Sequence, residues 1–177
     1  MRMNMRAAMG VASLVVLIGS GVSAAQTLKI GDQAPLIAGR DQNGQDWKLA
    51  DAIGKKVVLL YFYPKDDTPG CTKEACGFRD RMEDLKKENV EVIGVSFDTA
   101  DSHQKFIGKY HLNFRLLADT DGKIVDAYGV RIPDRNLANR VSFLIGLDGK
   151  IVHVTRNSEA EVHLAEMKTA VAHLAKR

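Results

Sequence analysis

The chain has 177 residues, of which 45% are hydrophobic and 27% charged, and its formal net charge is +3. This length and composition are typical of about one globular domain. The near-balance of charges excludes a strongly basic surface, so we predict no nucleic-acid partner.

Residues 1–25 have the three-part layout of a secretory signal peptide. Two arginines give a positive start, residues 11–18 are mostly apolar, and the segment ends on small residues. The alternative is a retained membrane anchor, but this apolar run is far shorter than the ~20 residues of a spanning helix. We expect cleavage after Ala24 or Ala25, leaving a single domain at residues 26–177 in the periplasm, with no membrane contact and a formal charge of +1.

The next strong signal is a continuous apolar run at residues 57–62. Such a run without polar alternation is typical of a strand buried on both faces of a sheet, so we predict a central strand. A loop rich in Pro, Asp, Thr and Gly follows, then a helical stretch at about 71–89 and a second apolar strand at 90–97. This order predicts a βαβ unit with a parallel pair of strands.

The second half of the chain alternates shorter elements. The pattern predicts a helix at 102–110, a strand at 114–118, a helical turn at 124–128, strands at 141–146 and 151–154, and a helix at 160–174. Asp148-Gly149 predicts a hairpin between the last two strands. The apolar residues of the final helix recur every three or four positions, which indicates core packing rather than a cofactor site. The whole order is compatible with a thioredoxin-like α/β sandwich, a mixed central sheet flanked by helices.

The chemistry is concentrated where the loop after the first strand enters the helix. Cys71 falls in the first helical turn, where unpaired backbone N–H groups and the helix dipole favour the thiolate, the reactive form of cysteine. Thr68 lies three residues upstream, so we expect its side chain to cap the helix. Pro64 and Pro69 stiffen the loop. A buried, inert cysteine is the alternative, but a Pro-x-x-x-Thr-x-x-Cys approach to a helix start favours a functional thiol.

This segment, from Tyr61 to Cys76, resembles the active-site loop of the peroxiredoxins. The Cys-x-x-x-x-Cys spacing is similar to that of the bacterioferritin comigratory protein, or Q-type, subfamily. The resemblance extends over nearly all of residues 28–176. It includes blocks at 95–103, 116–119, 127–130 and 140–145. It implies a thioredoxin-like fold with a peroxiredoxin-type N-terminal extension.

The resemblance also implies roles for six residues. Cys71 would be the peroxidatic cysteine that attacks a hydroperoxide, and Cys76 would resolve the product as an intramolecular disulfide. Pro64 would shield the thiolate, Thr68 and Arg140 would hydrogen-bond the peroxide, and Glu74 would orient the arginine. A fixed cation near the breaking O–O bond suits the negative charge that develops there.

The implied partners are hydrogen peroxide or organic hydroperoxides and a thioredoxin-like reductant protein. We expect a monomer, because the resolving cysteine of this subfamily is usually internal. We expect no cofactor and no metal, since two cysteines are too few for a zinc or iron–sulfur site and the five histidines lack ligand spacing. Each histidine is interpreted as a surface or packing residue. His111 stands where we would expect glycine or asparagine.

Two other functions stay open at this point. An exported thioredoxin-like disulfide oxidoreductase would suit the compartment, but such enzymes use Cys-x-x-Cys, whereas four residues separate Cys71 from Cys76. A non-enzymatic exported domain with a structural disulfide would not need Thr68 or Arg140. If residues 71–76 are regular helix when reduced, the cysteines cannot join without unwinding, because their Cα atoms would lie roughly 8.6 Å apart.

Overall fold

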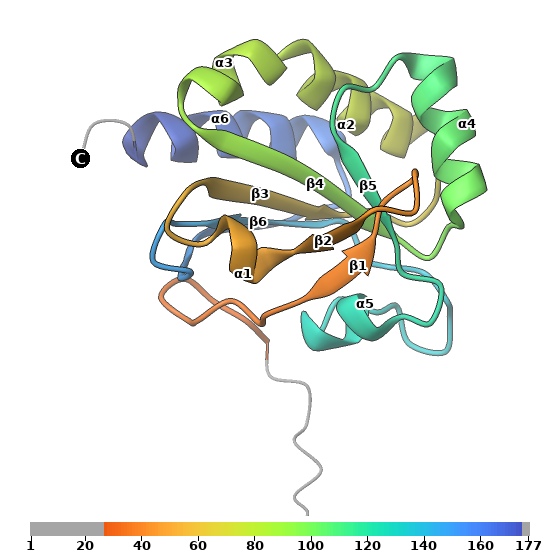
Figure 1. The fold of residues 1–177 in the computed structure, drawn as a ribbon, viewed down its shortest axis with the longest axis horizontal. Helices are drawn as coiled ribbons and strands as arrows, with labels where there is room; N and C mark the ends of the chain where they lie inside the picture. Colours follow the sequence, from red (N-terminus) through yellow and green to blue (C-terminus); the bar gives the residue numbers. More distant parts are fainter. Residues whose placement is uncertain (1–26, 175–177) are drawn as a thin grey trace, which may run out of the picture.

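The computed structural model describes residues 27–174, so the predicted signal peptide and its cleavage site lie outside the described part. A five-stranded sheet in the order β5-β4-β3-β6-β7 forms the centre (Figure 1). Its strands are β3 (Val57–Phe62), β4 (Val90–Ser96), β5 (Arg115–Ala118), β6 (Val141–Ile145) and β7 (Ile151–Arg156). Strands β3, β4 and β5 are parallel, whereas β6 and β7 are antiparallel to their neighbours. The mixed sheet, the central position of β3 and the β6–β7 hairpin are therefore confirmed.

Two layers of helices and loops cover the sheet. One face carries α2 (Pro69–Asp80), α3 (Met82–Lys87), α4 (Ala100–Tyr110) and α6 (Ala160–Leu174), drawn in the upper half of Figure 1. The other face carries α1 (Leu49–Ala52), α5 (Lys123–Ala127) and a small hairpin of β1 (Ala38–Arg40) and β2 (Asp46–Lys48). Among residues 27–174, no helix combines the length and apolarity that a membrane crossing requires.

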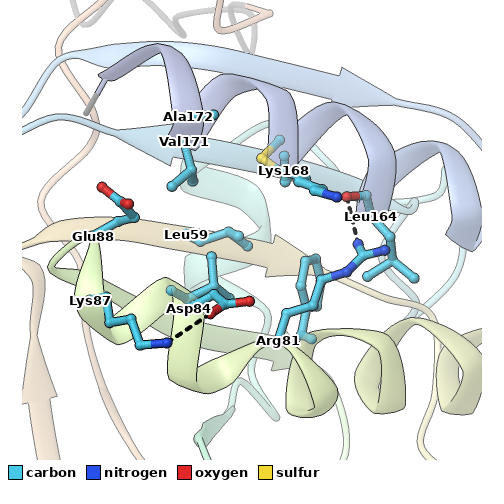
Figure 2. Close-up of a pocket in the computed structure, with 12 residues that line it drawn as sticks. Leu59, Arg81, Asp84, Lys87, Glu88, Leu164, Lys168, Val171 and Ala172 are labelled. Carbon is cyan, nitrogen blue, oxygen red and sulfur yellow. Dashed lines mark hydrogen bonds and ion pairs between the residues drawn. The ribbon is translucent and has the colours of Figure 1, made fainter. Parts of the chain in front are cut away.

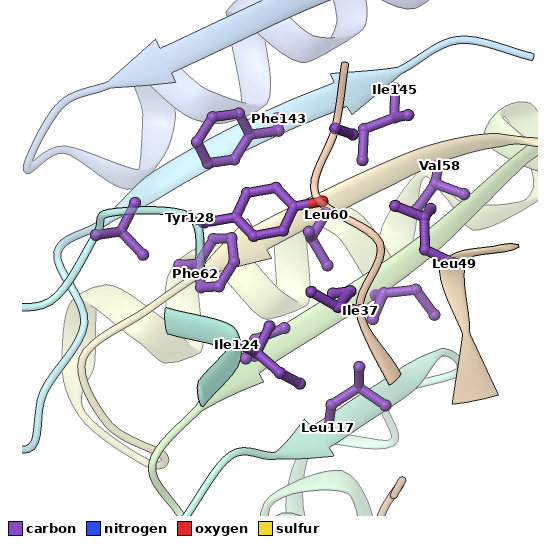
Figure 3. Close-up of a cluster of buried hydrophobic side chains, with 14 of the residues drawn as sticks. Ile37, Leu49, Val58, Leu60, Phe62, Leu117, Ile124, Tyr128, Phe143 and Ile145 are labelled. Carbon is purple, nitrogen blue, oxygen red and sulfur yellow. The ribbon is translucent and has the colours of Figure 1, made fainter. Parts of the chain in front are cut away.

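The side chains of β3 divide between the two faces, as the period of a strand requires. Val58, Leu60 and Phe62 point into the core beneath α5 and the N-terminal segment, which Figure 3 shows. Leu59 and Tyr61 point into a second core beneath α2 and α6. All six residues of β3 are buried, which explains why its sequence shows no polar alternation.

Two predictions about the elements need correction or explanation, and one small hairpin was not predicted. The stretch at 71–89 is not one helix: it begins earlier, at Pro69, and is interrupted at Arg81, where φ is −104° and ψ is 4°. Arg81 there donates a hydrogen bond of 2.8 Å to the carbonyl of Leu164 in α6. The hairpin of β1 and β2 was not predicted, because three-residue strands are too short to show a period. His111 ends α4 in the left-handed region (φ 53°), which explains the preference for glycine or asparagine there.

Candidate active site

The start of α2 places Cys71 close to the C-terminal end of β3, the middle strand of the sheet. The chain leaves β3 at Phe62, passes through the loop 63–68 and enters α2 at Pro69, whose missing N–H costs nothing at the first helical position. Cys71 is the third residue of the helix and is only 1% exposed. Its predicted position in the first helical turn is confirmed. The sulfur therefore lies among backbone N–H groups that have no partner within the helix.

Arg140 reaches this sulfur because β6 is hydrogen-bonded to β3. Val141 pairs with Phe62 in the antiparallel register, so the residue just before β6 lies beside the loop that follows β3. Arg140 Nη2 lies 3.4 Å from Cys71 Sγ. Its Nε donates to the carbonyl of Ser158 at 3.0 Å, and Nη1 donates to Glu74 Oε2. Arg140 is thus held on three sides, and the two residues are brought together across 69 positions of sequence.

The electrostatics of this group are dominated by burial and by the ion pair. Burial alone would lower the pKa of Arg140, but the charges of Glu74 and Cys71 outweigh it and raise that pKa above its ordinary value. Burial raises the pKa of Glu74 to about 7, although Arg140 acts in the opposite direction. Glu74 is fully buried, and its Oε1 has no hydrogen-bond partner. The site therefore contains a permanent cation and a carboxyl group that titrates near neutral pH.

Thr68 and Pro64, the two predicted site residues in the loop before α2, differ in their contacts. Thr68 occupies the N-cap position of α2, but its side chain makes no capping hydrogen bond, so that prediction was wrong. The hydroxyl donates instead to the carbonyl of Lys65 at 3.1 Å, because the loop turns back on itself at Asp67 (φ 57°). Pro64 lines a cavity of about 560 Å³ that also borders Arg140, Ile132 and Arg156. Pro64 and Arg140 thus border the same cavity.

Cys76 lies in the same helix as Cys71, as predicted. It is half-buried, packs against the core beneath α2 and α6, and both cysteines are free thiols. Glycine at the next position, Gly77, has a packing reason: a Cβ there would collide with the side chain of Leu164 in α6. The second half of α2 is thus pressed closely against α6.

A buried polar cluster fastens the loop before Cys71 to α4, and sequence reasoning missed it. Asp66 Oδ1 accepts a hydrogen bond of 2.7 Å from Tyr63, and Oδ2 accepts one of 2.7 Å from Ser102 and lies 2.9 Å from His103 Nδ1. The other ring nitrogen of His103 lies 3.2 Å from the carbonyl of Leu117. His103 is fully buried, and each of its ring nitrogens faces an oxygen of the protein.

A second buried histidine, His163, was missed as well. It lies three residues after Ala160 and four before Met167, both buried, so the helical period of the apolar stripe could have placed it on the inner face of α6. Its Nδ1 lies 3.5 Å from Glu74 Oε1. In the described part of the chain, no cluster of His, Cys, Asp and Glu residues could hold a metal ion.

A separate cavity of about 310 Å³ lies between α3 and α6 (Figure 2). Leu59 of β3 and Leu164 and Val171 of α6 line it with apolar side chains, and Asp84 and Lys87 of α3 also line it. None of the six predicted site residues lines this cavity. The structure thus brings Cys71, Glu74 and Arg140 into direct contact, and Pro64, Thr68 and Cys76 lie on the adjoining loop and helix.

Comparison with known proteins gives a consistent result. Residues 30–154 match the AhpC/TSA family. The chain is similar to "Peroxiredoxin Bcp" of Escherichia coli (strain K12), with 43% identity over 142 residues, which cover 77% of this chain and 90% of that protein. Among solved structures it resembles that of "Peroxidoxin BcpB from Mycobacterium tuberculosis", with a TM-score of 0.77 and 29% identity over 82% of this chain and 97% of the other.

A third similarity concerns a protein from Xanthomonas campestris. That structure, described under "Insights into the Alkyl Peroxide Reduction Activity of Xanthomonas campestris Bacterioferritin Comigratory Protein", has a TM-score of 0.72 and 27% identity. The match covers 78% of this chain and 92% of the other. The three matched proteins thus share most of their length with this chain.

Proposed function

We propose a reaction sequence for Cys71 from the premise that this chain belongs to the AhpC/TSA family and is a peroxiredoxin of the Bcp/PrxQ subgroup, a thioredoxin-dependent peroxidase. In the first step, the Cys71 thiolate attacks one oxygen of a hydroperoxide. A sulfur–oxygen bond forms and the O–O bond breaks. The departing oxygen keeps the bonding pair and takes up a proton, leaving as water or as an alcohol.

The contact between Arg140 Nη2 and Cys71 Sγ, at 3.4 Å, is the observation that carries this step. A guanidinium at this position stabilises the thiolate and also the negative charge on the departing oxygen. The Thr68 hydroxyl donates its hydrogen bond to the Lys65 carbonyl, so its oxygen has lone pairs free to accept a hydrogen bond from the peroxide. We assign Pro64 the role of limiting water access to the sulfur from the neighbouring cavity.

In the second step, the thiol of Cys76 attacks the sulfenic acid of Cys71, and water leaves as the disulfide forms. In regular helix, five residues separate Cα atoms by roughly 8.6 Å, which exceeds the span of about 7 Å that a disulfide tolerates. Since both cysteines lie in α2, the beginning of this helix has to unwind before the sulfurs can join. A thioredoxin-like protein then reduces the disulfide by two electrons.

A titration with peroxide tests both steps. Reduced protein treated with one equivalent of hydrogen peroxide should lose the mass of two hydrogen atoms in intact-mass spectra, as expected for one disulfide. Cys76→Ser should instead gain one oxygen and, with excess peroxide, two and three. Full turnover of Cys76→Ser with thioredoxin would contradict an internal resolving cysteine, and turnover of Cys71→Ser would contradict attack by Cys71.

The role of Arg140 has its own test. Arg140→Ala should slow peroxide attack by about a hundredfold, because one preorganised donor near a developing oxyanion contributes on that order. The rate is measured by stopped-flow competition with a second peroxidase. Arg131→Ala, which removes an arginine paired with Asp126 away from Cys71, is the matched control and should keep the rate. An unchanged rate in Arg140→Ala would remove this residue from the reaction.

We further propose that the protein acts in the periplasm as a monomer, on hydrogen peroxide and organic hydroperoxides. The export proposal rests on the signal-peptide layout of residues 1–25. N-terminal sequencing of the protein from cells should show a start at Ala25 or Gln26. A start at Met1 in the membrane fraction would contradict export with cleavage, and light scattering at several concentrations tests the monomer.

A further inference from the structure

Arg140 is held by a backbone carbonyl whose position depends on a buried histidine. Arg140 Nε donates to the carbonyl of Ser158 at 3.0 Å. Ser158 lies between β7 and α6, in a segment that is neither helix nor strand. The carbonyl of the preceding residue, Asn157, lies 2.9 Å from Nε2 of His163, which is fully buried in the first turn of α6. The segment that holds Arg140 is thus tied to α6 through His163.

The other ring nitrogen of His163 faces the strand that follows Arg140. Nδ1 lies 2.7 Å from the hydroxyl of Ser142 in β6, two residues after Arg140. The Asn157 carbonyl can only accept, so Nε2 donates to it and Nδ1 of the neutral ring accepts from Ser142. Burial lowers the pKa of His163, which favours this neutral ring. The single lone pair of Nδ1 is therefore taken up by Ser142, and Glu74 Oε1, 3.5 Å away, has no hydrogen-bond partner.

These contacts close a ring of bonds around Arg140. The ring runs from Arg140 along β6 to Ser142 and across His163 to Asn157. The next peptide unit then leads back to Arg140 Nε. A guanidinium is planar and its five donors have fixed directions, so a hydrogen bond at Nε limits where the other two nitrogens can point. Nη2 lies 3.4 Å from Cys71 Sγ in this arrangement, and its direction depends on the carbonyl that His163 holds in place.

We propose that His163 is a positioning residue for the peroxidase reaction: through the segment 157–158 it fixes the guanidinium of Arg140 against Cys71. The inference rests on the proposed function, in which Cys71 attacks the peroxide beside Arg140. Both hydrogen bonds of His163 are used within the ring, so it acts on the reaction through Arg140 alone. Without His163, the segment 157–158 loses its buried donor, and the acceptor of Arg140 Nε is no longer held in one place.

The first test measures how fast the Arg140 Nε proton exchanges with water, by nitrogen–proton NMR on the reduced protein purified from cells. This proton should be protected in the wild-type protein, because it is donated to a carbonyl. His163→Leu fills a similar volume but offers neither donor nor acceptor, so the exchange should become about tenfold faster. His163→Gln carries one of each and should recover most of the protection. Equal exchange in the wild-type protein and in His163→Leu would overturn the proposal.

Kinetics then test whether the effect passes through Arg140. Peroxide attack should slow about tenfold in His163→Leu, because a displaced catalytic group loses rate, and should largely recover in His163→Gln. In the Arg140→Ala background, His163→Leu should slow the reaction no further, since the residue that it positions is gone. An equal loss of rate in both backgrounds is the result for a purely structural histidine and would overturn the proposal.

The matched control is His153→Leu, because His153 also contacts α6, through Glu166 at 3.3 Å, but in a partly exposed position. It should leave the exchange and the rate unchanged, and an effect equal to that of His163→Leu would overturn the proposal. If His163→Leu does not fold, Ser142→Ala breaks the ring at another point and should speed the exchange severalfold, whereas unchanged exchange would overturn it. A wild-type rate in Arg140→Ala would refute the proposed function separately, because the exchange measurement does not involve peroxide.

Discussion

The two carboxylates on either side of Cys71, Asp66 in the loop and Glu74 in α2, are both buried beside a histidine, yet they are paired very differently. Asp66 receives hydrogen bonds on both oxygens, from Tyr63, Ser102 and His103. Glu74 has a bonded oxygen and an unpaired one, and its pKa is about 7. The number of donors decides whether a buried carboxylate can stay ionised. The loop before Cys71 is thus firmly held, and the helix after it is held by a group whose charge depends on pH.

The largest effect on stability should come from removing Asp66, the carboxylate that is fully hydrogen-bonded. Asp66→Ala removes the acceptor that faces Tyr63, Ser102 and His103, which should lower the free energy of unfolding by about 3–5 kcal/mol, since each buried polar group left unpaired costs ~1–3 kcal/mol. Urea denaturation of the reduced protein measures this. Asp80→Ala, which removes an exposed carboxylate paired with Arg79, is the control and should change little. A loss below ~1 kcal/mol in Asp66→Ala would show that the pairing contributes little.

The stability of α2 around Glu74, the carboxyl group with one unpaired oxygen, should depend on pH. Burial raises the pKa of Glu74 above its value of 4.5 in an unwound helix to about 7. The protonated carboxyl group therefore stabilises the intact α2 helix relative to its unwound form. This stabilisation is complete below pH 4.5 and is lost as the pH rises through 7. It amounts to at most about 3 kcal/mol. Hydrogen exchange of α2 amides, corrected for intrinsic rates, should show easier opening at pH 8 than at pH 5.

Glu74→Gln provides the control for this pH dependence, because an amide does not ionise. Its opening free energy should be nearly constant across the same range of pH. If the wild-type protein showed an equally flat profile, the contrast between Asp66 and Glu74 would have no consequence for the helix.

Packing of α2 against α6 should give the next effect. Gly77→Ala forces a methyl group into the side chain of Leu164, which should destabilise the closed helix by about 1–3 kcal/mol. Gly108→Ala in α4 is the matched control, because a Cβ added there would meet nothing outside its own stretch of helix within 4 Å. That substitution should stabilise the protein by about 0.5–1 kcal/mol. Thermal unfolding compares the stability of the two variants. Equal stabilities would mean that α6 shifts to accommodate the extra methyl group.

The smallest effect on stability is expected at Thr68, on the loop side. Its hydroxyl makes no capping bond, so Thr68→Ala should lower the free energy of unfolding by less than the ~1 kcal/mol typical of a lost cap. Its rate of peroxide attack should nevertheless fall, because the proposed hydrogen bond to the peroxide is lost. Thr99, which does cap α4 through Ser102 N, serves as the positive control for a lost cap in chemical denaturation. A Thr68 variant as unstable as Thr99→Ala would show that the loop depends on this hydroxyl.

Local sequence patterns predicted much of the fold and the position of both cysteines. The short apolar run at 57–62 is typical of a doubly buried strand, and a proline-stiffened loop leading into a helix places Cys71 at its first turn. Cys76 lies in the same helix because no residue between Cys71 and Cys76 terminates the helix. The family resemblance rests on this same segment and on its spacing.

Contacts across long stretches of sequence were decided by the tertiary structure alone. Arg140 reaches Cys71 because β6 pairs with β3, and no local pattern specifies which strands become neighbours. The same holds for His103 beside Asp66 and His163 beside Glu74, which depend on how α4 and α6 pack on the sheet. Protonation states depend on burial and on donors from distant segments, so only the folded chain determines that Asp66 is fully paired and that Glu74 titrates near neutral pH.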